Sequence, residues 1–196
     1  MSSFNNDHAL IYHLGLTRRT NPPPQKQAFA VMRASIATGC NLWNAGEFYR
    51  TPECNSMTLL KSYYEDYSED ADKVVLNMKG GARPDLSPDS SPEFVKKSVE
   101  NCLTLMSPRG RIDMFECARR DPSVPLEEIL SALAEFVNRG KIGGEALSEV
   151  SAATIREAAK ITKIVTVEIE LSLFSTEPLT NGIAQTCYEL NIPIIA

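Results

Sequence analysis

The stretch Lys73-Val-Val-Leu-Asn-Met78 decides the fold class of this chain. It is a short and almost continuously apolar run, which is typical of a strand whose two faces are both covered in a parallel sheet. A helical pattern precedes it at 56–67, and another follows at 93–106, after a proline- and serine-rich loop at 82–92. A strand flanked by helices in this way is the repeating unit of a parallel α/β fold.

The same alternation continues in both directions along the chain. Strand-like runs begin near residues 9, 41, 73, 112, 142, 164 and 192, and the first of them extends over 9–16. Helical patterns occupy 25–38, 56–67, 93–106, 126–139, 151–160 and 182–190. Strands that alternate with helices predict a parallel sheet with right-handed crossovers, which is either a doubly wound open sheet or a (β/α)8 barrel.

The turn after the first strand favours the barrel. A doubly wound nucleotide-binding fold carries a glycine-rich phosphate turn at that point. The corresponding stretch, His13-Leu-Gly-Leu-Thr-Arg-Arg-Thr20, has a single glycine and neither a GxGxxG nor a GxxxxGK motif. We therefore predict an α/β fold of the (β/α)8 TIM barrel type, as one domain over 1–196. The barrel is expected to be incomplete, with about seven of eight βα units, because Ala196 lies on the seventh strand and a full barrel takes ~250 residues.

Composition excludes several classes of function. The 196 residues include 20 Lys and Arg against 25 Asp and Glu, a net charge of −5 that lacks the basic excess of a general nucleic-acid binder. No apolar run approaches the ~18 residues of a membrane span, and residues 1–8 lack the features of a signal peptide. The five cysteines form no CxxC pair, so we expect reduced thiols, no metal and a cytoplasmic location. The acidic run at 65–72 is predicted to be the solvated end of a helix.

Polar side chains follow the ends of the predicted strands, where the function of a barrel is located. These strand ends are Trp43–Tyr49, Asn77–Lys79, Glu116–Pro122, Leu147–Glu149 and Glu168–Phe174. Tyr49 and Lys79 thus follow neighbouring strands. A nearby ammonium lowers the pKa of a phenol and prepares it to exchange a proton with a carbonyl or an alcohol.

Four stretches, in order along the chain, resemble the motifs of the aldo-keto reductase family, and most closely its fungal pyridoxal reductase branch. They are Asn44-Ala-Gly-Glu-Phe-Tyr49, Val74-Val-Leu-Asn-Met-Lys79, Ile112-Asp-Met-Phe-Glu-Cys117 and Gly140-Lys-Ile-Gly-Gly-Glu-Ala-Leu-Ser148. The resemblance extends from about Leu14 to Ala196. It implies NADPH-dependent reduction of an aldehyde or ketone, either a pyridoxal-like compound or an intermediate of fungal secondary metabolism.

The resemblance also assigns catalytic roles. Tyr49 would be the general acid that protonates the carbonyl oxygen, and Lys79 would lower its pKa. Asn44 aligns with the family's aspartate, which pairs with that lysine, and can hydrogen-bond without carrying a charge. The family's histidine aligns with Ala118, which can orient nothing.

The cofactor contacts come from the fifth and sixth strands. The resemblance places Ser148, Glu149 and Glu168 against the amide of the nicotinamide, where asparagine and glutamine are usual at the last two positions. It also places Glu145 in the barrel wall, where a carboxylate is costly to bury unless it is paired or protonated.

A second interpretation is a truncated, catalytically impaired barrel that acts, if at all, by association. The lack of an eighth unit favours it, as does Leu171, which stands where the family carries an aromatic side chain. Tyr49 and Lys79 favour the reductase. The unpaired edges of the first and seventh strands would leave backbone groups open for self-association through the open barrel edge.

Overall fold

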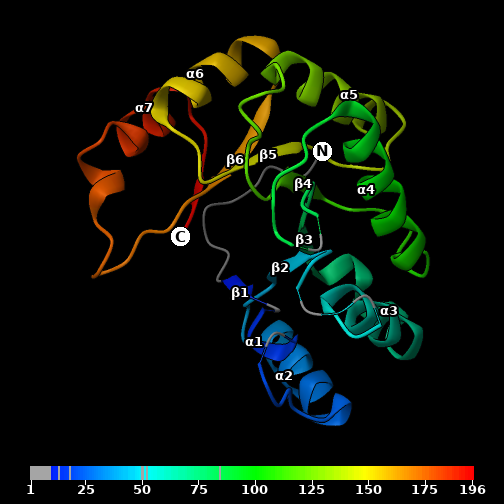
Figure 1. Ribbon diagram of the computed structural model, residues 1–196. Coiled ribbons are helices and arrows are strands. Elements are labelled where there is room, and N and C mark those ends of the chain that lie inside the picture. Colours follow the sequence, from blue (N-terminus) through cyan, green and yellow to red (C-terminus); the bar gives the residue numbers. More distant parts are fainter. Residues whose placement is uncertain (1–9, 13, 18, 50, 52, 84) are drawn as a thin grey trace.

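The computed structural model describes residues 10–12, 14–17, 19–49, 51, 53–83 and 85–196, and Figure 1 shows the chain. Its strands are β1 (Leu10–Tyr12), β2 (Leu42–Gly46), β3 (Val75–Gly80), β4 (Met114–Cys117), β5 (Glu145–Ser148), β6 (Ile164–Glu168) and β7 (Ile194–Ile195). Its α-helices are α1 (Leu14–Thr17), α2 (Gln25–Ala37), α3 (Ser56–Asp66), α4 (Pro92–Leu105), α5 (Leu126–Asn138), α6 (Ala152–Ile161) and α7 (Ile183–Glu189). Two 3-10 helices, η1 (Ser68–Lys73) and η2 (Glu177–Leu179), complete the described elements.

The strands form one parallel sheet of seven, in the order β1-β2-β3-β4-β5-β6-β7. A sheet whose order follows the sequence is that of a barrel, because a doubly wound sheet reverses direction at a switch point. The sheet curls, and α2 to α7 lie in an arc around its outer side (Figure 1). The prediction of an incomplete (β/α)8 barrel is confirmed.

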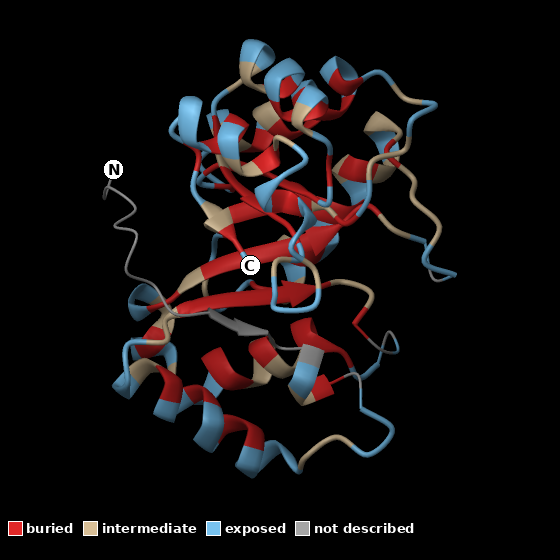
Figure 2. Ribbon diagram, turned by 90° about the vertical axis from the view of Figure 1, so that its left-hand side faces the viewer, coloured by how far each residue is buried: buried red, intermediate tan, exposed pale blue. Residues whose placement is uncertain are grey.

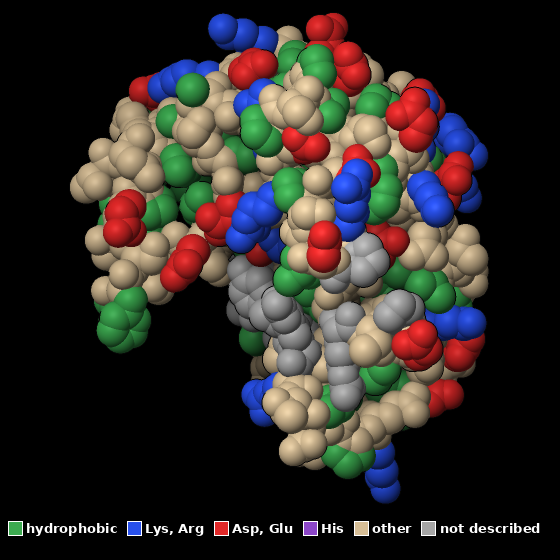
Figure 3. Space-filling view, viewed as in Figure 1, with side chains coloured by type: hydrophobic (Ala, Val, Ile, Leu, Met, Phe, Trp, Pro, Cys, Tyr) green, Lys and Arg blue, Asp and Glu red, His purple; other side chains and the backbone are tan. Residues whose placement is uncertain are grey.

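Burial follows this layering. Figure 2 shows β2 to β6 buried along most of their length, while the helices expose their outer faces. Buried Trp43 and Leu76 belong to a large core cluster on the β2, β3 and β4 side, and Ile155 and Val167 belong to a second one on the β5 and β6 side. Figure 3 shows a notch between the two arms of the curled molecule, with acidic and basic side chains along its edge.

Three local predictions need correction. The first strand was expected to run from residue 9 to residue 16, but β1 ends at Tyr12 and α1 takes up 14–17, while residues 9 and 13 lie outside the described residues. The fifth strand was expected from 142, but β5 begins at Glu145, and Ile142 makes only an isolated bridge to Ile112.

The acidic run at 65–72 is not wholly solvated. Its second half forms η1, in which Asp70 is only 4% exposed. The Tyr63 hydroxyl donates to Asp70 Oδ2 at 2.6 Å, and Lys73 Nζ lies 2.7 Å from Asp70 Oδ1. The carboxylate of Asp70 therefore ties η1 to the aromatic core beneath it.

The inner face of the curled sheet changes from apolar to polar along the strands. Its apolar layer consists of Leu42, Met114, Ala146 and Ile195. Side chains two residues apart on a strand share a face. Asn44, Glu116 and Ser148, each two residues further along β2, β4 and β5, therefore form a polar layer at the carboxyl ends of the strands.

No helix among the described residues is both long and apolar enough to cross a membrane. Within the same residues, no group of His, Cys, Asp and Glu side chains is arranged to hold a metal ion. All five cysteines are free thiols; Cys102 and Cys187 are buried, and the partly buried Cys117 packs against the large core cluster.

Candidate active site

Strand register brings six polar side chains together at the carboxyl end of the sheet. The register pairs are Asn44 with Asn77, Lys79 with Glu116, and Ser148 with Glu168. All six residues are buried. A polar layer in a protein interior is stable only if its groups bond to one another, so the contacts within this layer define the site.

Tyr49 is held over the end of β2 by the turn that follows the strand. Its backbone N–H donates to the Gly46 carbonyl at 3.3 Å, and its ring lies against Gly46, where an added Cβ would meet ring carbons at 2.9 Å. The hydroxyl of Ser56, at the start of α3, bonds both the N–H and the carbonyl of Gly46, at 2.9 and 2.8 Å. Glycine at 46 is therefore what lets the phenol lie back over the site.

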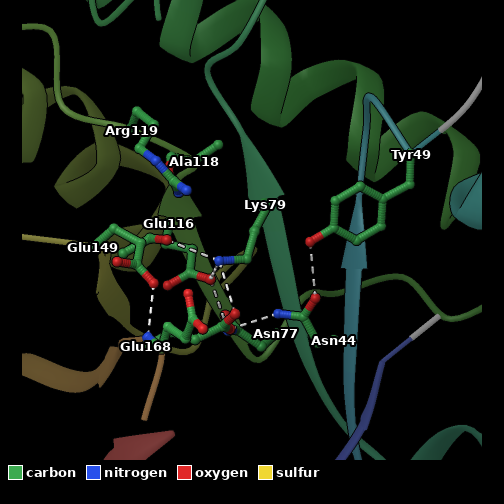
Figure 4. A network of polar contacts seen from close by, with 11 residues as sticks. Asn44, Tyr49, Asn77, Lys79, Glu116, Ala118, Arg119, Glu149 and Glu168 are labelled. Carbon is green, nitrogen blue, oxygen red and sulfur yellow. Dashed lines mark hydrogen bonds and ion pairs between the residues drawn. The ribbon is translucent and has the colours of Figure 1, made fainter. Parts of the chain in front are cut away.

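The Tyr49 hydroxyl points into the polar layer. The residue is only 6% exposed, and its hydroxyl donates to Asn44 Oδ1 at 3.1 Å. Asn44 Nδ2 in turn donates to Glu168 Oε2 at 2.6 Å. A chain of hydrogen bonds thus links the phenol on β2 to a carboxylate on β6, as Figure 4 shows.

Lys79 occupies the centre of the layer. Its ammonium lies 2.8 Å from Glu168 Oε1 and 3.0 Å from Glu116 Oε1, and it donates to Ser148 Oγ at 2.8 Å. An ammonium has three N–H groups, and these three acceptors match them. Lys79 therefore acts on the nearby Tyr49 phenol through space, by its charge.

Burial and charge shift the pKa values of this cluster in opposing ways. Burial alone would lower the pKa of Lys79, but the carboxyl groups of Glu116 and Glu168 outweigh it and raise that pKa. Burial raises the pKa of Glu116 to about 8, and the neighbouring Glu168 carboxylate adds to the rise, against the pull of Lys79. Burial thus favours the neutral form of Glu116, while the two carboxyl groups favour the charged form of Lys79.

The residues assigned to the nicotinamide amide lie in different surroundings. Ser148 and Glu168 belong to the buried layer, whereas Glu149 is exposed at its rim. Glu149 has a left-handed backbone, with φ of 53°, and its Oε1 accepts the Glu170 N–H at 2.8 Å. A residue other than glycine in this conformation is uncommon and often marks a functional site.

The end of β4 carries no histidine. Ala118 is buried, and the exposed Arg119 beside it donates from its guanidinium to the Ala118 carbonyl at 2.6 Å (Figure 4). Arg120 turns toward α6, where it bonds Thr154 Oγ1 at 3.3 Å and lies 4.0 Å from Glu157.

Two members of the layer, Asn77 and Glu116, were not assigned a role from the sequence. Asn77 Nδ2 donates to Glu116 Oε1 and to Glu168 Oε2, both at 3.0 Å. Asn77 precedes Lys79 by two residues, a spacing that places both on one face of a strand. That alternation could have identified Asn77, whereas the pairing of Glu116 with Lys79 depends on strand register.

The sequence of this chain matches the model of the aldo/keto reductase family over residues 12–196, and the chain belongs to that family. It is 46% identical over 185 residues to the probable pyridoxal reductase 2 of Schizosaccharomyces pombe, an alignment that covers 93% of this chain and 56% of that protein. It is 39% identical over 208 residues to the putative pyridoxal reductase of Saccharomyces cerevisiae, covering 97% of this chain and 59% of that protein. The chain thus spans little more than half the length of these relatives.

Solved aldo-keto reductases share the fold. A thermostable aldo-keto reductase, determined with the inhibitor epalrestat, superimposes with a TM-score of 0.78 at 18% identity, over 96% of this chain and 66% of its own. The holo form of an aldo-keto reductase from Bacillus halodurans gives a TM-score of 0.80 at 17% identity, over 96% and 60%.

Proposed function

We propose that this chain carries the carbonyl-reducing site of an NADPH-dependent aldo-keto reductase, with Tyr49 as the general acid. The position of Tyr49 is the observation that supports this most. Its phenol is buried, its hydroxyl bonds Asn44, and the Lys79 ammonium is close enough to interact with it electrostatically. A cation beside a phenol stabilises the phenolate that remains after the proton is transferred.

The strand ends beside this group fit the amide of a nicotinamide. A primary amide requires a donor for its carbonyl and acceptors for its N–H groups. Ser148 Oγ accepts from Lys79, which leaves its own hydrogen to donate, and Glu149 keeps carboxylate acceptors at the rim. Glu168 accepts from Lys79, Asn44 and Asn77, so its carboxylate is held at the carboxyl end of β6 beside Ser148. We propose Ser148, Glu149 and Glu168 as the residues that hold the amide.

The side chains divide the reaction between them. When bound, the reduced nicotinamide supplies a hydride to the carbonyl carbon. Tyr49 donates its hydroxyl proton to the carbonyl oxygen, which then becomes the alcohol. Asn44 holds the phenol oxygen in position, and the charge of Lys79 stabilises the phenolate that remains.

The substrate proposed is an aldehyde or ketone of the pyridoxal type, and two pyridoxal reductases among the relatives support that choice. An intermediate of fungal secondary metabolism is the alternative substrate. We also propose a cytosolic setting, which the five free thiols support.

Tyr49→Phe tests the assignment, since it removes the transferable proton and leaves the ring in place. We expect the rate of pyridoxal reduction, followed as NADPH consumption, to fall by at least about 100-fold. NADPH binding, followed by its fluorescence, should be retained. Tyr188→Phe is the matched control, because Tyr188 on α7 is 84% exposed and should leave the rate unchanged.

Equal rates in Tyr49→Phe and the parent would overturn the role of Tyr49. If the parent chain reduces no aldehyde or ketone, the second interpretation takes its place: a barrel that acts by association through its outer strands, β1 and β7. Sedimentation velocity would then be expected to show self-association.

A further inference from the structure

The buried layer around Lys79 has fewer hydrogen-bond donors than its acceptor atoms require. Among the described residues, Glu116 Oε2 and Asn77 Oδ1 are buried atoms that accept no hydrogen bond. The N–H groups of Lys79 and of the Asn77 amide are already directed at other acceptors. A buried acceptor without a donor is costly, and one additional hydrogen would reduce that cost.

The charges of the layer also indicate one additional proton. Two carboxyl groups, Glu116 and Glu168, flank one ammonium, so the charges of these three groups, when all are ionised, add up to −1. The exposed fractions of these side chains are 0% for Glu116 and 8% for both Glu168 and Lys79. An unbalanced charge in such a place is strongly unfavourable, whereas one proton on the carboxyl pair makes the cluster neutral.

The oxygen that lacks a donor is the natural place for this proton. Glu116 Oε1 already accepts from Lys79 and Asn77, and Glu116 lies within hydrogen-bonding reach of Glu168. A proton on Glu116 Oε2 turns an acceptor that lacks a donor into an O–H donor.

We propose that Glu116 and Glu168 share one proton, and that this singly charged carboxyl pair is the counter-ion that positions the Lys79 ammonium beside Tyr49. Glu116 is then a positioning residue for carbonyl reduction, acting through Lys79, and Asn77 bridges the two carboxyl groups. The effect on reduction rests on the function proposed above, whereas the shared proton itself does not.

The pH behaviour follows from the groups that face Glu116. These are Lys79 and Asn77 on β3, Glu168 on β6, and Cys117, which follows it on β4. Burial raises the pKa of the Cys117 thiol to about 12, so that thiol stays uncharged when Glu116 ionises. Above the pKa of Glu116, about 8, the pair gains a second negative charge beside Lys79 and Tyr49. That charge disfavours the phenolate left by proton transfer, so reduction should slow on the alkaline side.

Nuclear magnetic resonance with 13C at the glutamate carboxyl carbons tests the shared proton in the chain itself, without cofactor or substrate. We expect two carboxyl signals that remain protonated at pH 6, one from Glu116 and one from Glu145, whose pKa burial raises to about 7. Glu145→Gln, a substitution outside the site, should remove the second and leave the first. Glu116→Gln should do the reverse.

Glu168→Gln tests the sharing and does not depend on the folding of Glu116→Gln. It leaves Glu116 as the carboxyl group facing Lys79, so the pKa of Glu116 should fall by more than about one unit. A pKa of Glu116 that does not change would overturn the sharing. The absence of any protonated carboxyl signal at pH 6 in Glu145→Gln would overturn the proposal as a whole.

A separate measurement tests the link between Glu116 and Tyr49. The Cζ carbon of Tyr49, assigned through Tyr49→Phe, should change its chemical shift with the same pH midpoint as Glu116, and this change should vanish in Glu116→Gln. A merely structural role for Glu116 would not produce that inflection, so its absence in the parent chain would refute positioning. The pH profile of kcat should likewise lose, in Glu116→Gln, the part of its alkaline fall that has the midpoint of Glu116. If the NMR results hold while the chain reduces no carbonyl, the reductase proposal fails and the carboxyl pair stands.

Discussion

Glu145→Gln should make the chain more stable at neutral pH and leave it little changed in acid. Glu145 is 2% exposed, its Oε1 accepts a hydrogen bond from Thr162 Oγ1 of 3.3 Å, and its Oε2 has no partner among the described residues. Burial therefore raises the pKa of this carboxyl from 4.5 to about 7, although the Thr162 bond opposes the rise. Glutamine has a similar shape and does not ionise.

The magnitude follows from the two pKa values. Between pH 4.5 and about 7 the unfolded chain has released the Glu145 proton while the folded chain retains it. The free energy of unfolding falls by about 1.4 kcal/mol for each pH unit in that window, which amounts to about 3 kcal/mol by pH 8. The contribution is fully present below the unfolded pKa and is lost as the pH rises through the folded one.

Urea denaturation of the parent and Glu145→Gln at pH 5, 6, 7 and 8 measures this directly. The variant should gain on the parent by about 3 kcal/mol across the series, without a change in the slope against urea. Glu100→Gln on the exposed side of α4 is the control and should follow the parent at every pH. A difference between Glu145→Gln and the parent that stays constant with pH would refute the reasoning.

Three further substitutions test the site and the packing of the barrel below it. Lys79→Met leaves the buried carboxyl groups around it without a cation and should lower the free energy of unfolding by about 3–5 kcal/mol, measured by urea denaturation at pH 7. Gly143→Ala places a Cβ 2.6 Å from the Asp113 carbonyl oxygen, so backbone must move, and thermal unfolding should show a loss of about 1–3 kcal/mol. Asp70→Asn weakens the acceptor of the 2.6 Å hydrogen bond from Tyr63 and should cost about 1–2 kcal/mol at pH 7. The cost should shrink only as the pH falls below 3.8, because burial, which would raise the pKa of Asp70, is outweighed by the hydrogen bonds from Lys73 and Tyr63, which hold that pKa below its ordinary value.

The pattern of residues along the chain was enough to predict the fold. Short apolar runs marked the strands, and helical spacings, with glycine and proline between the elements, placed α2, α3, α4, α5, α6 and α7 within a residue or so of their observed bounds. Such local patterns can be recognised because every helix and strand of a βα repeat packs against its neighbours in the same way, so that its apolar residues recur at a regular spacing. The short elements α1, η1 and η2 were missed, since a single turn of helix produces too little periodicity to recognise.

For the site, motif resemblance led to Tyr49, Lys79 and Asn44, and the structure places all three in or over one buried layer. Motif resemblance did not lead to Glu116. In the sequence, Glu116 is a glutamate at the end of an apolar strand, and such a side chain is indistinguishable from one exposed to solvent. Whether that carboxyl meets water or an ammonium depends on the register of β4 against β3, which pairs Glu116 with Lys79.

The contact between Lys79 and Glu168 depends on strands that are further apart in the sheet. Strands β3 and β6 are separated in the sheet by β4 and β5, yet Lys79 Nζ and Glu168 Oε1 lie 2.8 Å apart. In a flat sheet, strands three positions apart would be separated by about 14 Å, and the two groups would not meet. Residue spacing along the chain therefore establishes the barrel and the strand-end chemistry, while the curl of the sheet gathers carboxyl groups from remote strands around one lysine.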